Sequence, residues 1–100
     1  MIRGPRVKPA ALAVYKHVIR DGQLADLAVE DLRRWRWWEL TADIAAQFGQ
    51  PTHQAPIVQN CLIRYAVTCP LPEAKALVVR ARQVDPEQVQ YQEKVNSQEQ

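Results

Sequence analysis

The six residues 33–38 hold all three tryptophans of this chain and three of its 13 lysine and arginine residues. The apolar patterns before and after this run do not share one helical phase. The pattern before it ends at Trp35 and the pattern after it begins at Trp37, about 200° apart on a continuous helix. We therefore expect the chain to turn between Trp35 and Trp38, so that two helices each direct their own stripe inward. The alternative is a single helix over residues 23–48, apolar on two sides and buried between layers.

The composition favours one small all-helical domain. One hundred residues suffice for a single domain, and a chain with 47% hydrophobic and 24% charged residues is typically globular. The low glycine content favours helices. No apolar run approaches the ~20 residues of a membrane span, and the basic N-terminus is not followed by the apolar core of a signal peptide. We expect a disordered segment over residues 1–8, an all-helical domain over residues 9–95 and a frayed polar tail over residues 96–100.

Proline and glycine residues divide the domain into short amphipathic helices. Gly22, Gly49 and Pro70 end three helices, and Pro56 and Pro86 begin two others. The pattern predicts five or six helices, over residues 9–21, 23–35, 37–48, 56–69, 73–84 and 86–95. The side chains expected to face the core are Leu12, Val14, Tyr15, Val18, Ile19, Leu24, Leu27, Ala28, Leu32, Trp35, Trp37, Leu40, Ile44, Phe48, Ile57, Val58, Cys61, Leu62, Tyr65, Ala66, Cys69, Leu77, Val78, Ala81, Val84, Val89 and Val95.

Residues 56–66, Pro-Ile-Val-Gln-Asn-Cys-Leu-Ile-Arg-Tyr-Ala, resemble the second helix of a HEAT repeat, in which a proline and a valine precede small and aliphatic positions. The chain departs from that family at Gln59, where arginine is common, and at Tyr65, where alanine is common. A similar pattern occurs 34 positions earlier, over residues 24–32. The resemblance implies antiparallel helical hairpins that pair the first helix with the second, the third with the fourth and the fifth with the sixth. Such a HEAT-like α-solenoid fragment usually presents a surface to a protein partner; an orthogonal bundle is the other arrangement open to these helices.

The residues that carry chemistry in enzymes are sparse and isolated. His17, expected on the flank of a helix, and His53, expected in a polar loop, are not spaced with other metal ligands. Cys61 and Cys69 would lie ~12 Å apart on one helix, too far to form a disulfide, and are expected to be small buried side chains. We predict no enzyme activity, catalytic residue, cofactor or metal. Free thiols fit a reducing compartment, so the cytoplasm is slightly favoured although the localisation is open.

The arginine–tryptophan run has three interpretations. Its tryptophans can fill the core at the corner between two helices, as we favour, or form a protein-binding hot spot, or contact a membrane or nucleic acid. Acidic residues one turn back are expected to pair with Arg33 and Arg34. The candidate partner-binding residues are Arg34, Arg36 and Trp37.

These features together predict a non-catalytic helical-repeat module for protein–protein interaction or structural support, within a larger protein. Its polar last helix suits the cap of an array, whereas apolar surface from Leu12, Val14 or Val18 at the other end would contact a protein partner, a neighbouring domain or a second copy. The competing hypothesis is binding of nucleic acid or an anionic surface, because residues 1–38 carry eight basic and four acidic residues. The net charge of only +2 makes this partner the less favoured one. The basic residues concerned are Arg3, Arg6, Lys8, Arg33, Arg34 and Arg36.

Overall fold

A computed structural model of the chain describes residues 7–99, and the regular structure in this range is entirely helical. The predicted all-α class is therefore confirmed. Six α-helices and one short 3-10 helix follow one another in the order α1 (Val7–Asp21), α2 (Ala25–Trp35), α3 (Thr41–Ala46), η1 (Pro51–His53), α4 (Pro56–Thr68), α5 (Pro72–Val84) and α6 (Pro86–Glu99).

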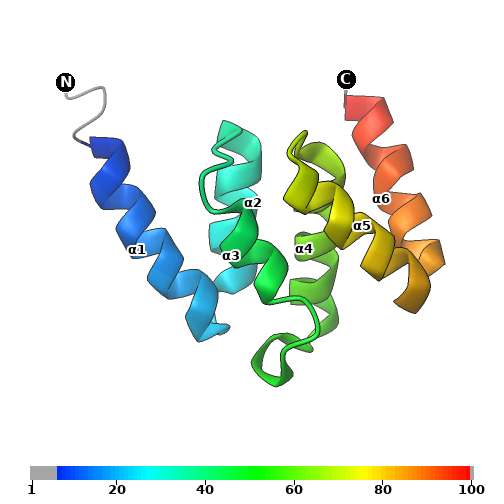
Figure 1. Cartoon of the computed structure of the whole chain (residues 1–100), viewed down its shortest axis with the longest axis horizontal. Coiled ribbons are helices and arrows are strands. Elements are labelled where there is room, and N and C mark those ends of the chain that lie inside the picture. The colour runs from blue at the N-terminus through cyan, green and yellow to red at the C-terminus, as the bar shows by residue number, and fades with distance from the viewer. Residues whose placement is uncertain (1–6, 100) are drawn as a thin grey trace.

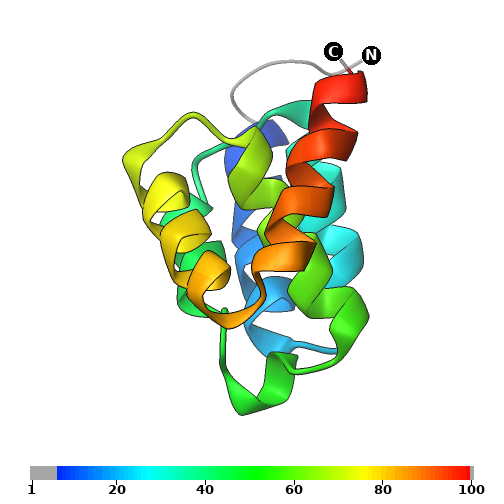
Figure 2. The same cartoon turned by 90° about the vertical axis from the view of Figure 1, so that its right-hand side faces the viewer.

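The helices lie in two layers (Figures 1 and 2). In one layer α3 contacts both α1 and α5, and in the other α4 contacts both α2 and α6. Consecutive helices also pack across the layers, as α1 with α2, α3 with α4 and α5 with α6. Helix α4 is central, whereas α1 and α6 lie at the two ends of the molecule (Figure 1).

The core lies between the two layers and draws on every α-helix. Each α-helix contributes at least one side chain that is almost entirely removed from water, and an aliphatic side chain buried in this way stabilises the fold by roughly 1.5–3 kcal/mol. The largest of these side chains are Ile19, Val29, Leu32, Ile44, Leu62, Ile63, Tyr65, Leu77 and Val89.

The predicted turn inside the arginine–tryptophan run is confirmed, and the single-helix alternative is wrong. Helix α2 ends at Trp35, and Arg36 adopts a left-handed conformation with φ of 58°. The Arg36 N–H donates to the Arg33 carbonyl oxygen at 3.1 Å, and the Trp37 N–H donates to the Leu32 carbonyl oxygen at 3.0 Å. These two bonds form a Schellman motif, in which a left-handed residue reverses the chain direction and satisfies the last helical carbonyls.

The rotation of α2 differs from the prediction. Leu24, Leu27 and Trp35 were expected in the core but are exposed, whereas Ala25 and Val29 are buried beside the correctly predicted positions. The buried side of the helix is thus turned by roughly 90° from the predicted stripe. Helices α1 and α4 cover this side, and the small Ala25 side chain allows close approach.

Ile57 and Val84, also predicted to be buried, are exposed, and so is Val14, which was expected to face either the core or a partner. Val14 lies on the terminal helix of its layer, and among the described helices none packs on the outer side of α1. Ile57 is in the first turn of α4 and Val84 is the last residue of α5, so both are at helix ends.

The ends of the described chain differ modestly from the predicted domain limits. Helix α1 begins at Val7, inside the segment predicted to be disordered, and residues 1–6 lie outside the described range. Helix α6 begins as predicted, with Asp85 Oδ1 accepting the Gln88 N–H at 3.2 Å, and it continues to Glu99 through the segment expected to fray. Among the described helices, none combines the length and apolarity that a transmembrane segment requires.

Candidate functional site

An exposed apolar stripe runs along the solvent side of α2. We call Leu27 and Trp35 of α2, together with Leu24 at its N-cap position, the outer stripe; the side chains of Leu24, Leu27 and Trp35 are 56%, 60% and 47% exposed. The spacing places the three within about 80° of one another on the helix, and along its axis they span about 16 Å. An exposed leucine alone needs no explanation, but three large apolar side chains on one side of a helix, with only Asp31 between Leu27 and Trp35, form a candidate docking surface.

Helix α1 borders the outer stripe. The Tyr15 hydroxyl donates to Asp31 Oδ2 at 3.1 Å, and its ring meets the Trp35 ring edge-on with centroids 5.8 Å apart. These contacts hold α1 against α2. The neighbouring Val14 is 62% exposed, whereas Val18 is half-buried against the core. The apolar surface predicted at this end of the molecule is therefore present, mainly through Val14.

The three tryptophans have different environments. Trp38 is half-buried and meets Tyr65 edge-on at 5.3 Å, and Trp37 is half-buried beneath the Lys8 ammonium, which lies 4.9 Å from its ring centroid. Trp35 stacks on Trp37 at a tilt, with centroids 5.1 Å apart, yet remains the most exposed of the three. The core-corner interpretation thus describes Trp37 and Trp38, whereas the expected burial of Trp35 is wrong.

Buried hydroxyl groups donate hydrogen bonds to the backbone of the corner that follows α2. The Tyr65 hydroxyl donates to the Trp37 carbonyl oxygen at 3.1 Å and lies 3.0 Å from Thr41 Oγ1. Thr41 Oγ1 donates to the Trp38 carbonyl oxygen at 2.6 Å. Burial is the main cause of a raised pKa of Tyr65, so this hydroxyl keeps its proton at neutral pH. The corner therefore presents Trp35 and its neighbours from a fixed backbone.

The predicted partner-binding residues lie at this corner. Arg34 and Arg36 are exposed on either side of Trp35, and within residues 7–99 neither forms an ion pair. The acidic partner expected for Arg34 is therefore missing from this range; the nearby Asp31 carboxylate accepts the Tyr15 hydroxyl. Trp37 is less accessible than Trp35, and its role in binding stays a prediction.

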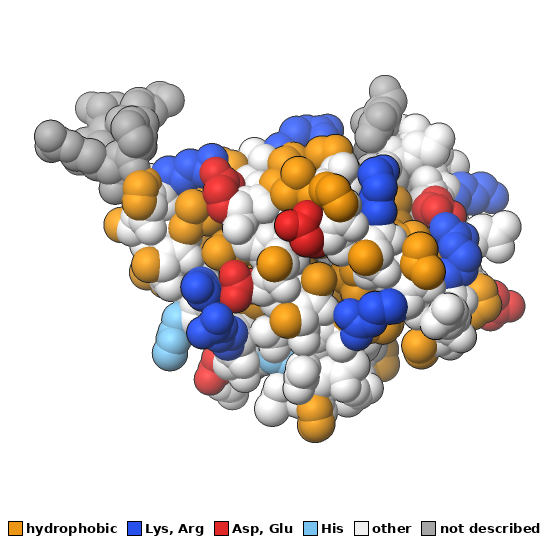
Figure 3. Space-filling view, in the orientation of Figure 1, with side chains coloured by type: hydrophobic (Ala, Val, Ile, Leu, Met, Phe, Trp, Pro, Cys, Tyr) orange, Lys and Arg blue, Asp and Glu red, His pale blue; other side chains and the backbone are white. Residues whose placement is uncertain are grey.

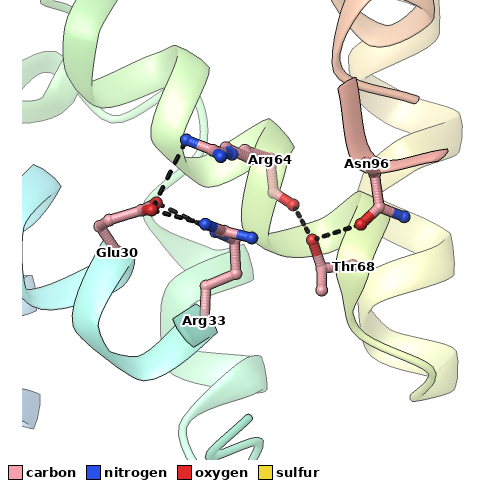
Figure 4. A network of polar contacts seen from close by, with 5 residues as sticks. All are labelled: Glu30, Arg33, Arg64, Thr68 and Asn96. Carbon is pink, nitrogen blue, oxygen red and sulfur yellow. Dashed lines mark hydrogen bonds and ion pairs between the residues drawn. The ribbon is translucent and has the colours of Figure 1, made fainter. Parts of the chain in front are cut away.

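Arg33 has the acidic partner predicted for it (Figure 4). Its guanidinium donates to Glu30 through Nε at 3.0 Å and Nη2 at 2.6 Å, and Arg64 Nη1 of α4 lies 3.5 Å from the same carboxylate. The Thr68 hydroxyl donates to the Arg64 carbonyl oxygen at 2.9 Å and lies 3.5 Å from Asn96 Oδ1 of α6. The network links the three helices of one layer.

The basic residues of the competing hypothesis are only partly accessible. Lys8 pairs with Glu39 at 2.7 Å, and this ammonium lowers the pKa of the Glu39 carboxyl. Arg33 is buried in its ion pair, and Arg3 and Arg6 lie outside the described residues. On the face shown in Figure 3, blue Lys and Arg side chains are interspersed with red Asp and Glu side chains. Within the described residues, Arg34 and Arg36 are thus the accessible members of the predicted set.

The histidine prediction needs one correction. His53 is completely buried, and its Nε2 donates to the Ile19 carbonyl oxygen at 2.6 Å, while Nδ1 lies 2.8 Å from Thr52 Oγ1. It satisfies a carbonyl in the last turn of α1, which has no partner within its own helix. No sequence signal indicated this, because the contact joins residues 34 positions apart. His17 is exposed on α1.

The thiols and the other potential metal ligands do not gather into a cluster within residues 7–99. Both cysteines are free; Cys69 is buried as predicted, but Cys61 is only half-buried. Burial and the nearby Glu30 carboxylate raise the pKa of Cys61 to about 11, which suppresses its reactive thiolate at neutral pH. Among residues 7–99, no group of three or more His, Cys, Asp and Glu side chains could hold a metal ion.

Sequence reasoning did not predict an open pocket of about 240 Å³ between the ends of α3, α4 and α5. Its carboxylate, from Asp85, already caps α6, and its other polar lining consists of carboxamides, so it offers no acid–base pair. The lining residues are Phe48, Gln54, Pro56, Gln59, Asn60, Ile63, Val84 and Asp85.

Comparisons of the chain with protein-family models, with curated proteins and with solved structures gave no match.

Proposed function

We propose that this chain is a non-catalytic helical module that binds or supports another protein segment through the outer stripe of α2. The observation that carries the proposal is the exposure of Leu24, Leu27 and Trp35 on one face of a helix whose opposite face is buried. Covering such a face with a partner helix would bury apolar surface worth about 25 cal/mol per Å² before the costs of association.

The packing of the helices supports a HEAT-like stacked array. Contacts of α1 with α3 and α3 with α5 in one layer, and of α2 with α4 and α4 with α6 in the other, are those expected when hairpins stack on their neighbours. An array of this kind ends in a unit whose outer face is polar. The outer face of α6 carries the exposed Glu87, Gln90, Lys94 and Gln98, which suit that role, together with one exposed aromatic residue, Tyr91.

The two ends of the molecule are thus chemically unlike. The α6 end combines a mostly polar helix with the exposed Tyr91, Val79 and Val84, whereas the α1–α2 end exposes the outer stripe and the adjacent Val14. This asymmetry favours contact with a neighbouring domain or a protein partner at the α2 end.

Site-specific photo-cross-linking tests the proposal. A benzophenone amino acid is placed at Leu27, or at Gln90 as the control, and the full gene product is expressed in its source cells. We expect position 27 to cross-link reproducibly to one protein segment that mass spectrometry identifies, and position 90 to give little product. Equal yields at the two positions, or no cross-link at position 27, would contradict the proposal.

A further inference from the structure

We infer that the outer stripe binds an amphipathic helix that carries acidic residues at the end lying over Trp35. This inference rests on the proposed function and adds the chemistry of the partner. Its basis is that two exposed arginines, Arg34 and Arg36, flank Trp35 at one end of the apolar outer stripe.

The length of the stripe favours a helical partner. Leu24, Leu27 and Trp35 present side chains along about 16 Å of α2, which matches three turns of a second helix. A helix that packs against such a face inserts apolar side chains at positions i, i+3 or i+4, i+7 and i+11. The contacts of Tyr15 with Asp31 and Trp35 fix α1 beside the stripe, so the face is formed before the partner binds.

The charges at the Trp35 end of the outer stripe favour a negatively charged partner. Arg34 and Arg36 flank Trp35 and are exposed, and neither has an ion-pair partner within residues 7–99. The neighbouring Arg33 is compensated by Glu30, and the Asp31 carboxylate, one turn before Trp35, accepts the Tyr15 hydroxyl, so Arg34 and Arg36 are the exposed cations at this end. A partner with carboxylates over Trp35 would supply the missing counter-charges and would speed association as well as fix the orientation.

A second copy of the chain is less well matched to this surface. Two outer stripes packed antiparallel would bring the middle of each α2 to the symmetry axis. Asp31 lies near this point on the stripe side of α2, so its carboxylate would approach the identical carboxylate of the other copy. This like-charge contact disfavours the symmetric pairing.

The test uses two fluorescently labelled helical peptides of about 18 residues, identical except for one terminal turn. Both carry leucine at positions i, i+4, i+7 and i+11; the acidic-end peptide has three glutamates in that turn, and the basic-end peptide has three lysines. Fluorescence anisotropy at low salt measures their affinity for the full chain. We expect the acidic-end peptide to bind about tenfold more tightly than the basic-end peptide.

Three variants locate and challenge the site. Leu27→Glu should abolish binding of both peptides, and the double variant Arg34→Glu, Arg36→Glu should reverse the preference toward the basic-end peptide. Gln90→Glu, on exposed α6, should bind like the unmodified chain. All altered side chains are exposed, and circular dichroism verifies that each variant is folded.

The outcomes separate this inference from the proposed function. Equal affinity for the two peptides, lost in Leu27→Glu, would overturn the acidic partner and leave the docking face intact. No binding of either peptide would overturn the inference, while cross-linking at position 27 judges the proposed function independently. If sedimentation equilibrium shows a dimer that Leu27→Glu dissociates, the inference of an acidic helical partner is overturned and a second copy of the chain is the occupant.

Discussion

At the scale of single residues, two glycines share a left-handed backbone but differ in surroundings. Gly22 has φ of 89°, and a Cβ at this position would lie 2.8 Å from the Thr52 carbonyl oxygen and 3.2 Å from His53 Cε1. Gly49 has φ of 86° and has no such neighbour within 4 Å. Gly22 thus allows the buried His53 to reach the end of α1, whereas Gly49 serves only the turn.

Alanine substitutions should separate these two roles. Gly49→Ala should cost about 1 kcal/mol of unfolding free energy, the strain of a left-handed alanine. Gly22→Ala should cost about 2 kcal/mol or more, because a backbone carbonyl must also move. Urea denaturation of the two variants measures the difference, and equal losses would show that the approach of Thr52 is unimportant.

Substitutions at Arg36 test the backbone strain at the corner that follows α2. A non-glycine residue at φ of 58° is strained, so Arg36→Gly should be more stable than Arg36→Ala by about 1 kcal/mol. The alanine variant is the control because it removes the same guanidinium and keeps the left-handed strain. Thermal unfolding compares the pair, and an alanine variant at least as stable as the glycine variant would contradict the Schellman geometry.

At the scale of elements, α6 is attached mainly through one side of a polar helix. Val89 is completely buried and Gln92 nearly so, with Gln92 Nε2 donating to Gln88 Oε1 at 2.7 Å. The sequence predicted a polar last helix with Val89 and Val95 facing the core. Tyr91, two positions after Val89, points to solvent instead.

Truncation of these neighbours should have unequal effects. Val89→Ala removes buried methyl groups and should lower the unfolding free energy by about 2 kcal/mol, whereas Tyr91→Ala should change it by less than about 0.5 kcal/mol. Urea denaturation monitored by circular dichroism provides both values. A similar loss in the two variants would mean that α6 is rotated from the described packing.

At the scale of the whole molecule, stability should fall in alkaline solution. Burial, the main cause in each case, raises the pKa of Tyr15, Cys61 and Tyr65, to about 11 for Cys61. The folded state therefore holds these protons more tightly than the unfolded chain. The resulting stability is fully present below the unfolded pKa values and is lost as the pH rises toward the folded ones.

Urea denaturation between pH 7 and pH 10 measures this effect. We expect a constant unfolding free energy up to pH 8 and a decline above the ordinary thiol pKa of 9.0. Cys61→Ala should decline less steeply, because one of the three groups is removed. An unfolding free energy that stays constant to pH 10 would contradict the raised values.

Much of the fold could be predicted because proline, glycine and apolar spacing act locally. The change of phase between Trp35 and Trp37 correctly located the end of α2, and Pro56 and Pro86 begin helices as predicted, while α5 begins at Pro72, one residue before its predicted start. Of the candidate site, Arg34 and Arg36 were named from sequence and are exposed at the corner. Leu24, Leu27 and Trp35 were missed because they were assigned to the core.

The chain's own residue pattern set the helical class, the division into five or six helices and the position of the corner, since these depend on contacts within a few residues. The tertiary structure alone decided which side of α2 faces the core and that His53 is buried. The apolar side chains of α2 cover more of the helix surface than one neighbouring helix can bury. The helix could therefore be rotated about its axis in several ways and still bury apolar side chains. The packing of α1 and α4 selects one of them, and in doing so leaves Leu24, Leu27 and Trp35 exposed to solvent.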